Sequence, residues 1–206
     1  MTFSLCSHLR NFVRLGKLKI KIRPSFQTVL KCNTVLHDSV LSEAEKLEIC
    51  LRLFVKHKYV LFFLSDNARA QLFKGYFEDF VNVGSRKNTV SKKVLDFSQD
   101  AAYIYSAFWQ CYGVDLLGKN RNLHWWSFAA LLGGLSDDTK MMQIVAIRSR
   151  PLPKPTKYNR EERAELMKLK TEFAIKLTEK ERKEQYQEGL AKLATSMEAW
   201  ARSMRR

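Results

Sequence analysis

The sequence predicts a mainly α-helical domain with a short β-hairpin near its N-terminus and a helical extension at its C-terminus. Apolar side chains recur at helical spacing in five segments, one short segment alternates with a period of two, and three prolines between residues 151 and 155 interrupt the pattern. The chain has 206 residues, 46% of them hydrophobic, which is enough to bury a core. We expect a core domain over 1–150, a proline-rich connector over 151–158 and a tail over 159–206.

The β-hairpin is predicted from residues 17–23, in which basic and apolar side chains alternate strictly. This period places the apolar side chains on one face of a half-buried strand. Gly16 allows a tight turn, so residues 11–15 are its predicted partner strand. The lysines either protect an edge strand from aggregation or form a strip that contacts nucleic acid.

Five helices are predicted between the hairpin and the prolines. The first has the clearest start, because Ser42 and Glu45 form a capping box that satisfies free backbone N–H groups. Glycines end the third helix at Gly113 and the fourth at residues 133–134, since glycine readily adopts the backbone conformation that follows a helix. Residues 83–94 are predicted to form a loop. The helices are expected at about 43–57, 65–80, 98–112, 122–132 and 136–148.

Two groups of residues invite a catalytic interpretation, and each has a structural alternative that we favour. Asp137 and Asp138 stand where the fifth helix begins, and carboxylates there interact favourably with the helix dipole. His124, Trp125 and Trp126 lie near the start of the fourth helix, which favours packing over catalysis. The two tryptophans could stack on bases, but adjacent helical residues point about 100° apart, which favours burial of at least one.

Motifs of enzymes are absent from the sequence. It contains no phosphate-binding loop, dinucleotide-binding glycine pattern, HExxH or GxSxG. The four cysteines and four histidines are scattered, which is typical of free thiols in a reducing cytoplasm and not of a metal site. The longest apolar run, Tyr59–Leu64, is far shorter than the roughly 20 residues of a membrane span. We expect no enzyme, catalytic residue, cofactor, metal, small-molecule substrate or membrane association.

The net charge of +15 favours partners that carry negative charge. Seven basic residues and no acidic one lie between Met1 and Lys31. Non-specific binding of nucleic acid follows from charge alone, so a basic nucleic-acid-binding protein remains a rival function. No helix-turn-helix, zinc-finger or RNA-binding motif supports that rival.

The tail is predicted to be a charged amphipathic helix that begins near Asn159. Its apolar stripes must be covered by its own domain, a second copy or a client protein. We expect a second copy or a client, because a rigid proline connector would hold the helix away from its own domain. The stripes are Leu166, Leu169, Phe173 and Leu177, followed by Leu190, Leu193, Met197 and Trp200.

Two central segments, residues 96–116 and 123–135, resemble the bacteriophage gene-product-15 family of phages and prophages of Gram-positive bacteria. The resemblance continues through Asp138, Thr139 and Ile147–Ser149, and extends less sharply upstream to about Ile20. The motif residues, which we expect to be structural, are Asp96, Phe97, Asp100, Tyr103, Ile104, Phe108, Tyr112, Gly113, Asp115, Leu116, His124, Trp125, Phe128, Leu132, Gly134 and Leu135.

The resemblance implies a non-catalytic tail assembly chaperone that binds the tape measure protein in the cytoplasm of the bacterial host. Members of the family are encoded in the tail-morphogenesis region, so other tail proteins and self-association are also expected. A structural virion component of the tail or connector is the first alternative function.

Overall fold

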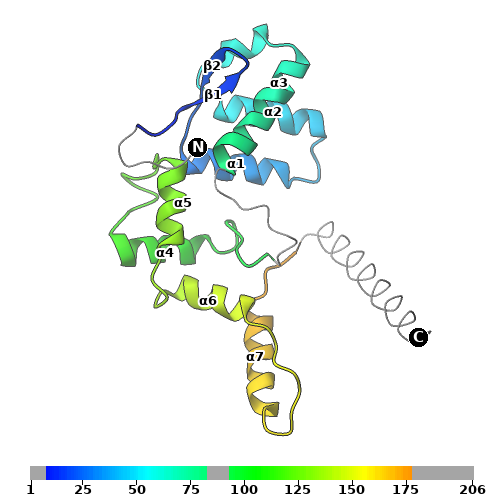
Figure 1. Ribbon diagram of the computed structural model, residues 1–206, viewed down its shortest axis with the longest axis vertical. Helices are drawn as coiled ribbons and strands as arrows, with labels where there is room; N and C mark the ends of the chain where they lie inside the picture. The colour runs from blue at the N-terminus through cyan, green and yellow to red at the C-terminus, as the bar shows by residue number, and fades with distance from the viewer. Residues whose placement is uncertain (1–7, 83–92, 178–206) are drawn as a thin grey trace, which may run out of the picture.

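The computed structural model describes residues 8–82 and 93–177, and it has the mainly α-helical fold with an N-terminal hairpin that the sequence predicts. The elements from β1 to η2 form one half of the structure, and those from α4 onward form the other (Figure 1). They follow in the order β1 (Phe12–Leu15), β2 (Leu18–Lys21), α1 (Phe26–Leu36), α2 (Glu43–Phe54), η1 (Lys58–Phe63), α3 (Asp66–Tyr76), η2 (Phe77–Val81), α4 (Ala101–Tyr112), α5 (Trp125–Gly133), α6 (Lys140–Ser149) and α7 (Arg160–Glu172).

The hairpin closes through a two-residue turn between β1 and β2. Gly16 occupies this turn with φ +56°, a left-handed conformation that glycine adopts without a steric cost. Val13 pairs with Ile20, and both side chains are buried. Beyond the hairpin, Ile22 forms an antiparallel bridge with Val55, which ties this segment to the end of α2.

Helix α1 is absent from the elements that the sequence predicts. Ser25 caps it, because its hydroxyl accepts the backbone N–H of Thr28 at 3.3 Å. Phe26, Val29 and Cys32 are buried on its inner face. These three residues are spaced three apart, which is a helical pattern, so the segment after Pro24 does contain a sequence signal for α1.

Stacked aromatic rings fill the core of the first half. The rings of Phe54 and Tyr76 lie 3.9 Å apart and nearly parallel, and Phe80 lies 5.4 Å from Tyr76. Cys32 and Cys50 are buried beside them. A hydrogen bond with Cys50, together with burial, raises the pKa of the Cys32 thiol, so it stays protonated at neutral pH.

A second stack of rings fills the core of the other half. Phe128 of α5 lies between Phe26 at 4.6 Å and Phe108 at 5.1 Å, with both pairs of rings close to parallel. Phe26 belongs to α1, so this stack joins the two halves. All three side chains are at most 5% exposed.

The start of α5 fastens the two halves together by hydrogen bonds. The indole N–H of Trp125 donates to the Val81 carbonyl at 3.0 Å, and that of Trp126 donates to the Phe80 carbonyl at 2.8 Å. His124 caps α5, because its Nδ1 accepts the Trp126 N–H at 3.1 Å. Both indoles therefore satisfy carbonyls at the end of η2, where a helix leaves acceptors free.

Of two helix starts predicted from the sequence, the structure confirms that of α2 and differs at that of α6. The predicted capping box of Ser42 and Glu45 is present at the start of α2. The predicted start of the fifth helix at residues 136–137 is wrong, because Thr139 caps α6 instead, accepting the Met142 N–H at 3.3 Å. The Asp138 carboxylate accepts a local hydrogen bond from the Ser136 hydroxyl, and the Asp138 carbonyl accepts one from the Gln143 side-chain amide.

The C-terminal end of α7 contacts the end of α6, and Figure 1 shows the rest of α7 extending away from α6 at the base of the view. Leu166 on α7 is only 6% exposed. Lys170 Nζ donates to the Arg148 carbonyl at 3.0 Å, and the Gln99 side-chain amide exchanges two hydrogen bonds with the backbone of Lys176, at 2.7 and 2.8 Å. Residues 170–177 therefore contact the chain's own domain, whereas the division into a core, a connector and a tail stays a prediction.

The connector itself explains why α7 returns to the body. Asn159 donates to the Lys154 carbonyl and accepts the Thr156 N–H, both at 2.9 Å. The Arg163 guanidinium donates to the Pro153 carbonyl, and Arg150 pairs with Glu162 at 2.8 Å. These contacts turn the chain, although the prolines keep it extended over a few residues.

Candidate partner-binding surface

A buried ion pair holds the family motif to the end of α6. Arg148 contacts both carboxylate oxygens of Asp100, at 2.6 and 2.8 Å, and the two side chains are 10% and 2% exposed. Asp100 also accepts the Asp96 N–H at 2.9 Å, and Arg148 donates to the carbonyls of Val94 and Phe173. Through these contacts Arg148, at the end of α6, holds the start of α4 and the end of α7 in place.

The remaining polar motif residues shape turns. Asp96 accepts the N–H groups of Ser98 and Gln99 at 2.9 Å each. Asp115 does the same for Leu117 and Gly118, at 3.0 and 2.9 Å. These are Asx-type turns, in which a carboxylate satisfies nearby backbone donors.

Glycine is needed at one motif position, directly after α4. Gly113 has φ +62° and ends the helix in the left-handed conformation. The hydroxyl of the preceding Tyr112 donates to the Leu131 carbonyl at 2.9 Å, which ties α4 to α5.

An open apolar groove lies between α1, α4 and the segment that follows α4; we call it the α1/α4 groove. Its volume is about 430 Å³, and Phe26, Ile104 and Phe128 form a buried floor. Leu117 stands on its edge and is 72% exposed. The full lining is Phe26, Gln27, Leu30, Lys31, Phe97, Ala101, Ile104, Tyr105, Leu116, Leu117 and Phe128.

The motif residues identified in the sequence line only part of this groove. The motif supplies Phe97, Ile104, Leu116 and Phe128, but the wall formed by α1 is missed because α1 itself is missed. Several other motif residues pack in the second core outside the groove: Tyr103, Phe108, Tyr112, Leu132 and Leu135. Gly134 follows α5 as its C-cap, and its position faces the Tyr112 hydroxyl.

The predicted tail stripe is divided by the structure. Leu166 is buried within the described chain, while Leu169, Phe173 and Leu177 are half-buried. Lys140 of α6 lies over the Phe173 ring at 5.1 Å. Leu193, Met197 and Trp200 lie outside the described residues, so their role as partner contacts stays a prediction.

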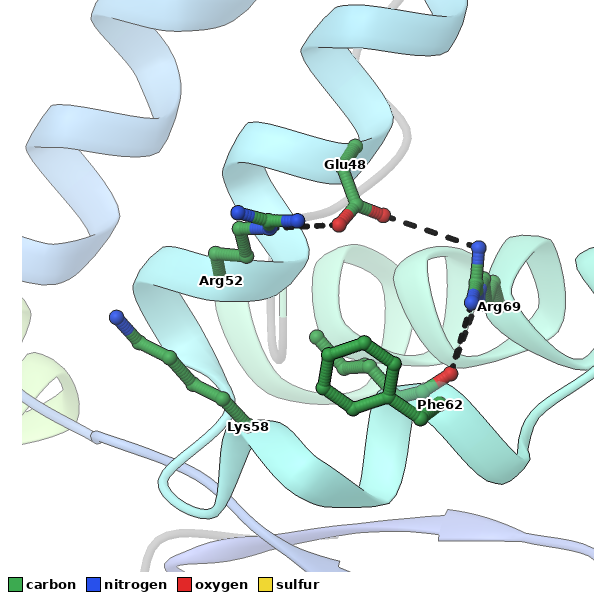
Figure 2. Close-up of a pocket in the computed structure, with 6 residues that line it drawn as sticks. Glu48, Arg52, Lys58, Phe62 and Arg69 are labelled. Carbon is green, nitrogen blue, oxygen red and sulfur yellow. Dashed lines mark hydrogen bonds and ion pairs between the residues drawn. The ribbon is translucent and has the colours of Figure 1, made fainter.

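A second surface feature is the exposed aromatic face of η1. Figure 2 shows the adjacent pocket of about 180 Å³, where Glu48 lies between Arg52 and Arg69. Arg52 pairs with Glu48 at 2.6 Å, and Arg69 donates to the Leu61 carbonyl at 2.9 Å. These charges hold η1 against α2 and α3, so the pocket is structural. Tyr59, Phe62 and Phe63 on η1 are 62%, 80% and 86% exposed.

Burial lowers the pKa of one titratable motif residue, His124. Desolvation disfavours its charged form, and the Arg10 carbonyl that contacts Nε2 at 2.9 Å opposes this effect only in part. The neutral ring is the form that caps α5, because Nδ1 must accept a hydrogen bond.

The described parts of the chain carry no metal or membrane signature. Within residues 8–82 and 93–177, no three His, Cys, Asp or Glu side chains are placed to hold a metal ion. In the same residues no helix is long and apolar enough to cross a membrane.

Comparison with known proteins gives one match. A family model described as bacteriophage Gp15 protein matches residues 7–175, which include every described element and the whole lining of the α1/α4 groove. No curated protein and no solved structure matches the chain.

Proposed function

The chain belongs to the bacteriophage Gp15 protein family, and from this membership we propose that it is a non-catalytic tail assembly chaperone. In this proposal it binds segments of the tape measure protein in the host cytoplasm while the phage tail is built. Membership places the chain among bacteriophage proteins; the chaperone role and its client are the proposed part.

The open α1/α4 groove is the observation that carries the proposal. A tape measure protein is a long helical chain, and before assembly its apolar stripes need a partner that covers them. The groove offers apolar side chains from two helices and is left uncovered by the described residues of the chain. Its floor consists of the family-motif residues Ile104 and Phe128 together with Phe26.

The choice of this groove over η1 rests on its concave shape and aromatic floor. Binding energy concentrates where side chains enter a well-packed pocket and exclude water. The aromatic side chains of η1 are exposed, and the pocket that Phe62 helps to line holds the charged side chains that fix η1 in place. The groove is therefore the better site for the apolar face of a helix.

Leu117→Glu tests the proposal without disturbing the fold, because this side chain is 72% exposed. We expect the variant to lose co-purification with the tape measure protein of the same phage genome, since a carboxylate at the groove edge would have to be desolvated on binding. Val40→Glu is the matched control: Val40 is 89% exposed and lies between α1 and α2, outside the groove.

Two results would count against the chaperone role. Equal retention of the tape measure protein by both variants would exclude the groove as its site. Mass spectrometry that finds the chain in finished particles, in a fixed ratio to tail proteins, would favour the structural virion component instead.

A further inference from the structure

A basic cleft lies on the other side of α1 from the apolar groove. The bridge between Ile22 and Val55 builds it, because Lys56 N–H donates to the Lys21 carbonyl at 3.0 Å and Arg23 N–H donates to the Phe54 carbonyl at 2.7 Å. Ile22 and Val55 point into the core, so their sequence neighbours Lys21, Arg23 and Lys56 point outward. The cleft has a volume of about 670 Å³ and also takes Lys31 from α1.

The charge in this cleft is not balanced by the residues that line it. The lining includes Lys21, Arg23, Lys31 and Lys56 and no carboxylate. Among the described residues none of these four cations forms an ion pair, and the Arg23 guanidinium donates to the Leu53 carbonyl at 3.2 Å. Other cations do form ion pairs, as Arg148 does with Asp100 and Arg52 does with Glu48. Four unpaired cations in one concavity raise the local concentration of anionic groups.

The basic cleft and the apolar groove share one rim. Gln27 and Lys31, one helical turn apart on α1, line both cavities. A ligand that crosses α1 at this point therefore meets an apolar surface on one side and a basic surface on the other. The rise of a helix is about 1.5 Å per residue, so side chains three or four positions apart on a bound helix can reach both.

We propose that the two cavities bind a single acidic amphipathic helix, with its apolar stripe in the α1/α4 groove and Asp or Glu side chains in the basic cleft. This inference rests on the proposed function and names the chemistry of the client segment. A nucleic acid fits this surface less well, because its phosphate backbone offers no apolar stripe to fill the adjoining groove.

The test uses two synthetic helical peptides that share one leucine-rich stripe and differ only in three positions beside it, Glu in one and Gln in the other. Their affinities for the full chain are measured by fluorescence anisotropy at low and physiological salt. The cleft variant is Lys21→Gln with Lys56→Gln. The matched control, Lys119→Gln with Lys168→Gln, removes the same charge at exposed positions outside the cleft.

We expect the Glu peptide to bind more tightly than the Gln peptide, and the cleft variant to lose about three- to tenfold of that affinity at low salt, as two partly exposed ion pairs would give. The control variant should bind like the unchanged chain. The Gln peptide should bind all three proteins equally, because it uses only the groove.

Other outcomes overturn the inference in distinguishable ways. If both peptides bind equally and the cleft variant matches the control, the cleft takes no carboxylates, although the groove still binds a helix. If neither peptide binds, and Leu117→Glu changes nothing, the proposed function fails with it. If a 20-mer DNA duplex loses affinity on the cleft substitutions while the Glu peptide does not, the cleft is a phosphate site.

Discussion

Replacing Arg148 by Met should destabilise the protein more than any other single loss of charge on α6 or α7. The substitution keeps much of the apolar stem but removes the guanidinium that holds Asp100, whose side chain is only 2% exposed. A buried carboxylate would be left with the Asp96 N–H as its remaining partner, and the carbonyls of Val94 and Phe173 would lose a donor. Breaking one side of a buried ion pair costs about 3–5 kcal/mol.

This magnitude can be measured against a matched exposed pair. Arg150 contacts Glu162 at 2.8 Å, but the two side chains are 59% and 57% exposed. Arg150→Met should therefore cost at most about 1 kcal/mol, because solvent screens exposed pairs. In thermal unfolding, a chain of this size shifts by roughly 2–4 °C per kcal/mol, so we expect a fall of roughly 6–20 °C for Arg148→Met.

The assay is thermal and urea unfolding followed by circular dichroism and by the emission of the half-buried Trp125 and Trp126. Because Arg148 also binds the Phe173 carbonyl, Arg148→Met should in addition expose α7 to protease before global unfolding. The second substitution Asp100→Asn should recover part of the loss, since it removes the unpaired charge. If Arg148→Met lowers the unfolding temperature no more than Arg150→Met does, the Arg148–Asp100 ion pair does not hold α4, α6 and α7 together.

Two further predictions concern the capping of helices. Stability should fall as the pH is lowered from about 7 towards 5, because the folded pKa of His124 is below its unfolded value near 6.5 and the unfolded chain binds the proton more readily. His124→Asn, which can still cap α5, should flatten this dependence in urea titrations at several pH values; an unchanged slope would assign it to other groups. Gly113→Ala should cost about 1–2 kcal/mol because of its φ of +62°, while Gly133→Ala, with no atom within 4 Å of the added methyl group, should not destabilise. Equal calorimetric melting temperatures for the two glycine variants would contradict the left-handed cap.

Local patterns made the hairpin and most helices predictable from the sequence. The strict alternation over residues 17–23 and the glycine before it specify a strand and its turn, and Ser42 with Glu45 specifies the start of α2. Helix α1 escapes this kind of inference because Thr28, Asn33 and Thr34 have low helix propensity, and packing of its inner face against both cores decides its structure.

Burial and side-chain hydrogen bonds decide the features that the sequence patterns do not predict. Ser136 and Thr139 are both acceptable caps, and only the buried position of Thr139 selects the start of α6. The direction of the tail depends on the contacts of Asn159 and Arg163 with the connector, which composition does not reveal. The candidate surface requires α1 and α4 to line one cavity, although their residues lie far apart in the sequence.

The most direct test of the central claim is photo-crosslinking from the edge of the α1/α4 groove in cells that assemble the phage tail. Leu117 replaced by p-benzoylphenylalanine places the probe on an exposed side chain, and the same probe at Val40 reports non-specific contacts. A tape measure segment crosslinked from position 117 and not from position 40 is the result that this account predicts. Crosslinks to the tape measure protein that are equal at both positions, or absent at 117, would contradict it.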